Sequence, residues 1–374
     1  MIYLDAAATT LQKPPAVAKA AGEAVLALSS PGRGGYPSAQ RAADVAFACR
    51  TELAELFHIG NPERVVFTHN ATHGLNIAIK SLISPGDRVV ISGYEHNAVT
   101  RPLAALHADT VTVAGELFHS EAVTESFEPL LTPETAAVIC NHVSNVFGFV
   151  QPVEEIAALC RARGIPLIVD ASQSAGVIPL DMDALGAAYL AMPGHKGLYG
   201  PQGTGVLLCG EGVQPKPLLE GGTGTQSLLQ EMPDFLPDRL EAGTHNMPGI
   251  AGLLAGIRYV RERGERNICR RERQLALMAA ELLRELPGIR VYAAPGLRDQ
   301  IGVLSFTVEG WDCETLAEKL AEADIALRAG LHCSPLAHRT AGTLATGTLR
   351  VSFSDFSTPQ DVGRFFEEVK RLIS

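Results

Sequence analysis

An aspartate and a lysine that each follow an apolar run are the residues whose types and spacing first suggest chemistry. Asp170 ends the run Pro166–Asp170, and Lys196 stands in the glycine-rich segment Gly194–Gly205 after a second run. Taken singly, the aspartate could cap a helix or bind a metal, and the lysine could be a solvated loop residue. Together they fit a Schiff-base lysine for an electron-sink cofactor whose protonated ring nitrogen pairs with the aspartate.

A candidate phosphate site precedes these residues in the chain. The segment His69–Gly74 follows the predicted strand Arg64–Thr68 and leads directly into a predicted helix. The first turn of a helix offers free backbone N–H groups and the positive end of the helix dipole, and the Thr72 hydroxyl adds a donor. Thr72 as a simple helix N-cap is the alternative, and the local sequence alone favours that alternative.

Cys333 has the most reactive setting among the seven cysteines. It lies in a polar loop after Arg328 and His332, where nearby positive charge favours the thiolate and a loop gives access. Cys140 and Cys160 lie in apolar segments, where cysteine is usually an inert hydrophobic residue. Since the cysteines are widely spaced and form no C-x-x-C pair, we expect no disulfide framework, no metal site and a reducing, cytoplasmic location.

The composition is that of an ordinary globular protein with a large core, because 46% of the 374 residues are hydrophobic and 19% are charged. The net charge is −10 and the basic residues are scattered, which argues against nucleic acid or an anionic membrane as the main partner. No apolar run reaches the roughly 18 residues of a membrane-spanning helix, and the N-terminal segment lacks the pattern of a secretory signal.

Short β-branched runs alternate with longer amphipathic runs in the first half of the chain, which predicts an α/β fold with a mainly parallel sheet. The predicted strands are Arg64–Thr68, Arg88–Ser92, Thr110–Val113, Ala136–His142, Pro166–Asp170, Tyr189–Met192 and Gly203–Cys209. The helices predicted between them are Gly74–Leu82, Asn97–Leu106 and Val153–Arg163.

A smaller α+β domain is predicted at the C-terminus. One long helical stretch from Pro248 to Leu286 leads into it. Its predicted strands lie near Gly302–Val308, Ala326–Arg328 and Thr348–Ser352, and its helices near Cys313–Glu322 and Thr358–Ile373. We therefore divide the chain into residues 1–250, an N-terminal arm with a large domain, and residues 251–374, the linking helix with a small domain that carries Cys333.

The order of these motifs resembles that of a known family. Over nearly its full length the chain is similar to the class V, fold-type I enzymes that use pyridoxal 5′-phosphate, and within them to the cysteine desulfurases and selenocysteine lyases. The matching segments are Tyr3–Thr10, Tyr94–Ala98, His142–Gly148, Val169–Gln173, Gly194–Lys196, Glu241–Thr244 and Arg328–Cys333. The resemblance implies a seven-stranded, mainly parallel sheet, and the short loop around Cys333 resembles the SufS-like group.

The resemblance also implies how the cofactor is held. Lys196 is expected to carry pyridoxal phosphate as a Schiff base, Asp170 to pair with the ring nitrogen, and Gln173 to bind the ring oxygen. His96 is expected to stack on the ring and to move protons. The phosphate is expected to contact Thr72, the backbone of Ala71, His195 and, across a homodimer interface, Thr244 of the other subunit.

Substrate roles follow from the same resemblance. Arg350 and Asn145, with Arg328 nearby, are expected to bind the carboxylate of L-cysteine or L-selenocysteine. The leading hypothesis is a desulfurase that releases L-alanine, keeps the sulfur on Cys333 as a persulfide and passes it to an acceptor protein, as in iron–sulfur cluster assembly. The alternatives are a selenocysteine lyase, an epimerase or β-lyase for which Cys333 is dispensable, and a non-catalytic sulfur-handling scaffold.

Four positions depart from the family pattern, and one of them is His73, which stands where an acidic residue is common. Pro193 stands where a serine or threonine is usual, so one phosphate donor is missing and either weaker cofactor binding or compensation by His73 or another group is expected. Leu331 replaces the first of two histidines before Cys333, and Ser334 replaces an alanine after it. These changes indicate a divergent subfamily.

Overall fold

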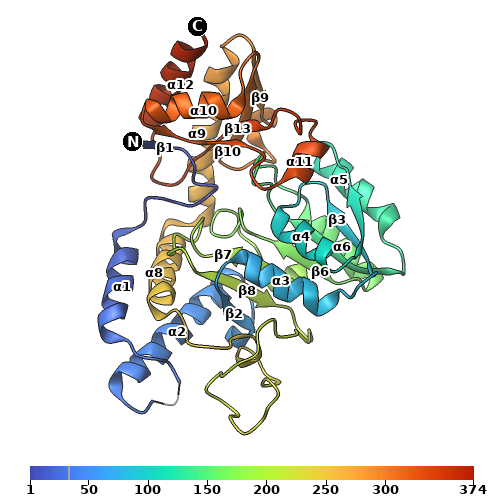
Figure 1. Ribbon diagram of the computed structural model, residues 1–374, viewed down its shortest axis with the longest axis vertical. Coiled ribbons are helices and arrows are strands. Elements are labelled where there is room, and N and C mark those ends of the chain that lie inside the picture. Colours follow the sequence, from blue (N-terminus) through green and yellow to red (C-terminus); the bar gives the residue numbers. More distant parts are fainter. Residues whose placement is uncertain (33) are drawn as a thin grey trace.

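A seven-stranded sheet forms the centre of the computed structural model, which describes residues 1–32 and 34–374 (Figure 1). Its strand order is β2-β8-β7-β6-β5-β3-β4, and only β8 runs antiparallel to its neighbours. The strands are β2 Val65–Thr68, β3 Arg88–Ser92, β4 Asp109–Val113, β5 Thr135–Asn141, β6 Leu167–Asp170, β7 Tyr189–Pro193 and β8 Gly205–Cys209. All seven predicted strands and the α/β class are confirmed, with small shifts at the strand ends.

Helices cover both faces of this sheet, which explains why its strands are apolar throughout. On one face, Val89 and Ile91 of β3 pack with α3 Ala71–Leu82 and α4 Asn97–Ala105. On the other face, Val90 packs in the core that includes side chains of α2 Pro37–Leu56, α5 Ser120–Phe127, α6 Val153–Arg163 and α8 Met247–Arg263. The other helices of the large domain are α1 Pro15–Ala27 and the short α7 Met182–Leu185.

A second, antiparallel sheet with the order β12-β13-β10-β9 forms the small domain. Its strands are β9 Ile289–Tyr292, β10 Val303–Val308, β12 Arg328–Gly330 and β13 Thr348–Ser352, and its helices are α9 Glu265–Arg284, α10 Cys313–Glu322, α11 Pro335–Thr340 and α12 Pro359–Ile373. Its separate core also contains Ile2 and Leu4 from the N-terminal arm. In that arm, β1 Ile2–Tyr3 pairs in parallel with β11 Ile325–Ala326.

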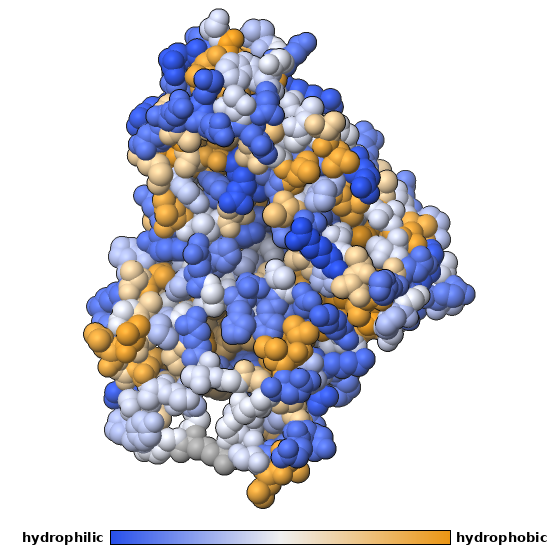
Figure 2. Space-filling view, in the orientation of Figure 1, coloured by the Kyte–Doolittle hydropathy of each residue, from blue (hydrophilic) through white to orange (hydrophobic). Residues whose placement is uncertain are grey.

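The N-terminal arm therefore begins at the small domain and descends to α1 beside the large sheet, as the ribbon shows (Figure 1). Hydrophilic residues extend across the middle of the same face, between the small domain and the large sheet (Figure 2). Within the described ranges, no helix has both the length and the apolar character that crossing a membrane requires.

The single helix predicted from Pro248 to Leu286 is wrong, because two helices occupy this stretch. Gly264 ends α8 and precedes α9 with φ 82°, in the left-handed region that an α-helix cannot contain. The predicted strand Ala326–Arg328 is likewise two short strands, since β11 pairs with β1 and β12 pairs with β13.

Gly256 allows α8 to pack directly on the loop that follows Lys196. A Cβ atom at Gly256 would lie 2.3 Å from the carbonyl oxygen of Leu198. We expect Gly256→Ala to lower the free energy of unfolding by about 1–3 kcal/mol through overpacking. The matched control is Gly363→Ala in α12, where a Cβ meets nothing within 4 Å. The control should stabilise the chain by about 0.5–1 kcal/mol, because alanine favours the helix. Urea unfolding of both variants checks this, and equal stability would contradict it.

Candidate active site

One cavity of about 120 Å³ lies where β6 and β7 end and α3 and α4 begin. The carboxyl ends of parallel strands and the first turns of helices meet at such a place. Eight of the residues singled out in the sequence line it: Ala71, Thr72, His96, Asn145, Asp170, Gln173, His195 and Lys196. Pro193 also lines the cavity at the end of β7. The structure therefore brings together residues from widely separated parts of the chain.

The first turn of α3 is open toward this cavity. Asn70 is the helix N-cap, because its side chain accepts a hydrogen bond from the backbone N–H of His73. The alternative that Thr72 is the N-cap is therefore wrong. Thr72 lies in the first turn with an exposed side chain. The backbone N–H groups of Ala71 and Thr72, which have no intrahelical partner by position, and the Thr72 hydroxyl form an arrangement that suits a phosphate.

Lys196 and Asp170 form the chemical centre of the cavity. Burial lowers the pKa of Lys196 to about 8, although the nearby Asp170 carboxylate opposes this shift. Asp170 is buried, and its Oδ1 accepts a hydrogen bond of 2.9 Å from the backbone N–H of Ser172. The lysine amine is thus closer to the neutral, nucleophilic form than an exposed lysine, and the carboxylate has a fixed position.

Two histidines beside this centre are held in defined orientations. The Nδ1 atom of His96 accepts a hydrogen bond of 3.0 Å from the backbone N–H of Ala98, so a neutral His96 ring carries its proton on Nε2. Burial lowers the pKa of His96. Burial, together with the positive charges of Lys196 and Lys13, lowers the pKa of His195 to about 4. The Nδ1 atom of His195 lies 3.0 Å from the Thr9 hydroxyl, which leaves Nε2 for a ligand.

The backbone next to Lys196 is held by the N-terminal arm. The carbonyl oxygen of His195 accepts hydrogen bonds from the Thr10 N–H at 3.2 Å, the Thr10 hydroxyl at 3.0 Å and the Lys13 ammonium at 2.8 Å. Burial lowers the pKa of Lys13 to about 8. Lys13 was not predicted as a site residue, because no local pattern connects it with a carbonyl group 182 residues away.

A third cluster joins the arm to the small domain. Arg350 is buried and donates from NH1 to the Asn145 carbonyl at 2.8 Å and from NH2 to Asp5 Oδ1 at 2.7 Å. Arg328 Nε lies 3.3 Å from Asp5 Oδ2. The buried Nε–H of Arg350 has no hydrogen-bond partner among the described residues. Asp5, which was not predicted as a site residue, bridges the two arginines predicted to bind substrate.

Cys333 is exposed, and its loop is tied to the cavity wall. Its carbonyl oxygen accepts a hydrogen bond of 2.9 Å from the N–H of Asn97, the residue after His96. Asn145, which lines the cavity, donates to the His332 carbonyl at 2.8 Å and accepts from the Ser334 hydroxyl at 2.6 Å. The loop therefore places a free thiol on the surface, with its backbone bonded to the residues that surround Lys196.

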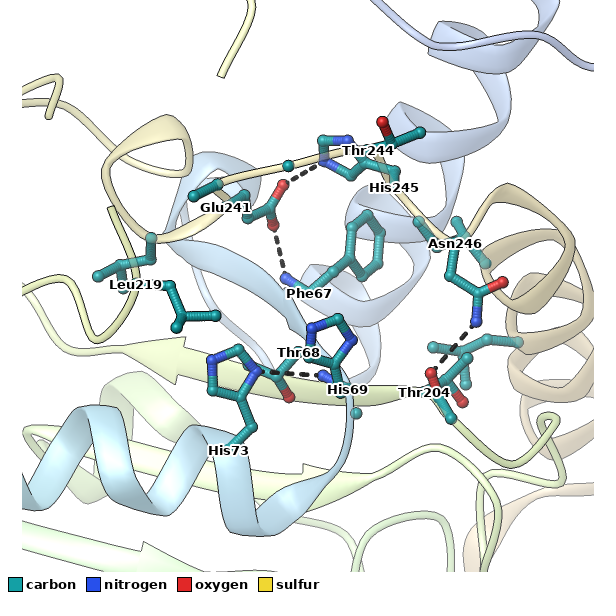
Figure 3. A pocket seen from close by; sticks show the side chains of 17 residues that line it. Phe67, Thr68, His69, His73, Thr204, Leu219, Glu241, Thr244, His245 and Asn246 are labelled. Carbon is teal, nitrogen blue, oxygen red and sulfur yellow. Dashed lines mark hydrogen bonds and ion pairs between the residues drawn. The ribbon is translucent and has the colours of Figure 1, made fainter. Parts of the chain in front are cut away.

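Thr244 and His73 are not in this cavity. They line a separate pocket with His69, against which the His73 ring stacks at 5.0 Å (Figure 3). There Glu241 accepts hydrogen bonds from the Phe67 N–H at 2.6 Å and from His245 at 2.7 Å. His73 therefore does not line the cavity that Pro193 lines. In the described part of the chain, no group of three or more His, Cys, Asp and Glu side chains is arranged to hold a metal ion.

Known proteins with similar sequences and structures share this fold. A family model described as Aminotransferase class-V matches residues 2–365. A probable cysteine desulfurase of Methanothermobacter thermautotrophicus is 32% identical over 98% of this chain and 94% of its own length. One from Mycolicibacterium paratuberculosis is also 32% identical, but this chain spans only 55% of its length.

Solved structures extend this comparison. The apo structure of cysteine desulfurase from Thermococcus onnurineus NA1 matches with a TM-score of 0.89 and 30% identity, over 100% of this chain and 94% of that chain. The cysteine desulfurase CsdA of Escherichia coli matches with a TM-score of 0.87 and 28% identity, over the same shares of the two chains.

The depressed pKa of Lys196 predicts that this residue costs stability in the ligand-free chain. Its pKa is about 8 when folded and 10.5 in the reference state, so the unfolded chain holds this proton more tightly. We expect ligand-free Lys196→Met to be more stable than the parent chain below pH 8, because the variant has no buried charge. The difference should be limited to roughly 1–2 kcal/mol, because water that enters the cavity screens the lysine charge in the parent chain. The advantage should shrink as the pH rises from about 8 toward 10.5.

Urea unfolding across this pH range measures the difference. Lys13 is present in both proteins, so its titration cancels in the comparison. Lys19→Met, which removes an exposed lysine from α1, is the matched control and should give no such advantage. A stability difference that does not vary with pH would contradict the expected burial of the charge.

Proposed function

The chain belongs to the class-V aminotransferase family, and from this premise we propose that it is a pyridoxal-phosphate-dependent cysteine desulfurase. It would convert L-cysteine to L-alanine and take the sulfur onto Cys333 as a persulfide. The observation that carries this proposal is the exposed Cys333, whose loop is hydrogen-bonded to Asn145 in the wall of the cavity that holds Lys196 and Asp170.

The residues of the cavity fit pyridoxal phosphate. Lys196 would hold the aldehyde carbon, Asp170 the ring nitrogen, and the first turn of α3 with Thr72 the phosphate. Gln173 donates one amide hydrogen to the Ala7 carbonyl at 3.0 Å, and its second amide hydrogen remains for the ring oxygen. When bound, the cofactor supplies an electron sink for negative charge at the substrate α-carbon.

The other steps belong to side chains of this protein. The Nζ atom of Lys196 would remove the α-proton, and His96 would move protons through Nε2. The Cys333 thiolate would attack the substrate sulfur, so that the S–S bond forms as the substrate C–S bond breaks. The substrate β-carbon would then take up one proton and the α-carbon would regain one, which gives alanine. An acceptor thiol outside the chain would then remove the sulfur by exchange.

Arg350 and Arg328 would bind the substrate carboxylate. The buried Nε–H of Arg350, which has no hydrogen-bond partner in the described part of the chain, supports this assignment, because a carboxylate would satisfy it. Thr244 lies outside the cavity of its own chain, which fits a role in the site of a second subunit and hence a homodimer. The seven cysteines are all free, as suits a reducing cytoplasm.

Cys333→Ala tests the sulfur transfer. We expect the variant to bind pyridoxal phosphate with an unchanged absorbance spectrum but to lose at least about tenfold in L-alanine release from L-cysteine, since no thiol accepts the sulfur. Mass spectrometry of the parent protein after L-cysteine should show one added sulfur on the Cys333 peptide. The matched control is Cys269→Ala, which removes a partly buried thiol outside the cavity and should leave the rate unchanged.

The same measurement separates the alternative activities. Equal turnover by Cys333→Ala and the parent would exclude the proposed transfer and favour an epimerase or β-lyase. Comparing kcat/KM for L-selenocysteine and L-cysteine distinguishes a selenocysteine lyase, because these substrates differ mainly at the atom that leaves. If the parent protein gains no absorbance band on addition of pyridoxal phosphate, all the pyridoxal-phosphate-dependent activities are excluded and the non-catalytic sulfur-handling scaffold is favoured.

Arg350→Lys tests the carboxylate site. Lysine keeps the charge but loses the paired N–H donors, including the contacts with Asp5 and the Asn145 carbonyl. We expect kcat/KM for L-cysteine to fall about 10–100-fold, mainly through a higher KM. Steady-state kinetics, with pyridoxal phosphate content measured by absorbance, check this. An unchanged KM would place the substrate carboxylate elsewhere.

A further inference from the structure

A groove outside the active site carries an unusual concentration of positive charge. Its cavity volume is about 560 Å³, and it lies between one face of α9, the turn Val177–Pro179 and the segment Gly296–Ile301. Four arginines line it, namely Arg266, Arg270, Arg273 and Arg298, and among the described residues no acidic side chain lines it. The groove is therefore locally positive in a chain with a net charge of −10.

These arginines have few partners within the protein. Arg273 donates to the backbone carbonyl of Arg298, and none of the four forms an ion pair with a residue in the described ranges. Arg266 and Arg270 are exposed on successive turns of α9. Their spacing, and that of Arg270 and Arg273, sets like charges side by side on a helix, which is mildly unfavourable for the helix itself. An anion bound across these arginines would remove this repulsion.

The floor of the groove is apolar. Val177 and Ile301 are buried there, and Leu277, on the same face of α9 as the arginines, is partly buried. The opposite face of α9, including Leu275 and Ala279, is buried in the core of the small domain. The groove therefore combines an apolar floor with a row of guanidinium groups along one wall.

We propose that this groove binds an acidic peptide segment of a partner protein, with apolar side chains on the floor and carboxylates on the arginines. The three arginines of α9 span about 10 Å of helix, a length that fits several charges in a row better than one phosphate group. An extended segment of five residues covers about 17 Å and directs alternate side chains to opposite sides, as the floor and the arginine wall require. The concave shape of the groove disfavours a membrane surface.

The groove is distinct from the active-site cavity, because the two share no lining residue, although Val143 of the cavity packs in one apolar cluster with Val177 and Ile301 of the groove. Its occupancy therefore does not depend on the proposed reaction, and failure of one proposal leaves the other standing.

Fluorescence anisotropy with the full chain tests this binding. The probe is a labelled seven-residue peptide that alternates glutamate and leucine, and the control peptide carries glutamine in place of each glutamate. We expect saturable binding of the glutamate peptide that weakens as salt rises, and at least about tenfold weaker binding of the glutamine peptide. Arg266→Gln/Arg270→Gln should weaken binding of the glutamate peptide by a similar factor.

Arg284→Gln is the matched control, since Arg284 is exposed on α9 but does not line the groove. It should bind the peptide as tightly as the parent, and thermal unfolding shows whether each variant is folded. No saturable binding, or equal binding by the double variant, would overturn the proposal. Displacement of the peptide by ATP at equal affinity would identify a small-anion site instead. Arginine-dependent binding to phosphatidylserine vesicles, without peptide binding, would identify a membrane site.

Discussion

The carboxylate of Asp5 connects three parts of the molecule that the site requires together. It lies in the N-terminal arm and contacts Arg350 and Arg328 of the small sheet. Arg350 in turn donates to the carbonyl of Asn145, which lines the cavity of the large domain. Because Arg350 is buried, its charge requires a nearby anion, and Asp5 provides it. These contacts form one continuous connection from the arm through the small sheet to the wall of the cavity.

The arm performs a second task on the other side of the cavity. Thr10 and Lys13 surround the carbonyl oxygen of His195 with donors, and this fixes the backbone from which Lys196 extends. The burial of Lys196 lowers its pKa and favours a neutral amine. A reactive lysine thus requires a rigid backbone on one side and a shielded cavity on the other, and the arm contributes to both requirements.

Much of the fold follows from simple sequence patterns, and the site follows in part. The strands of the large sheet are apolar throughout because helices cover both faces, so each one was predictable. The grouping of residues at strand ends and helix starts, such as Asp170 and Thr72, was also predictable, because the carboxyl ends of parallel strands meet at one edge of the sheet.

Contacts across long sequence separations were not predictable. Asp5 meets Arg350 at a separation of 345 residues, and Lys13 meets a backbone carbonyl, which has no sequence signature. The choice of Thr72 as the N-cap of α3 was wrong because the sequence offers two capping residues. Asn70, two positions earlier, is at least as good a cap, and only the structure shows which one is used. Gly264 was missed as a break because a glycine inside a helical pattern is often tolerated, and only its φ angle shows that the helix ends.

The break at Gly264 has a mechanical consequence. α8 packs on the loop beyond Lys196 through Gly256, whereas α9 packs in the core of the small domain. A continuous helix would couple these two bodies as one rigid lever, so that any tilt of the small domain would strain the lysine loop. With a single glycine between them, the angle between α8 and α9 is set by one pair of backbone dihedrals and by contacts that cross the break, since Tyr259 and Arg263 of α8 donate hydrogen bonds of 2.5 and 2.7 Å to Asp355 of the small domain. Any change of that angle would have to break these bonds, which hold the small domain to the helix that packs on the loop beyond Lys196.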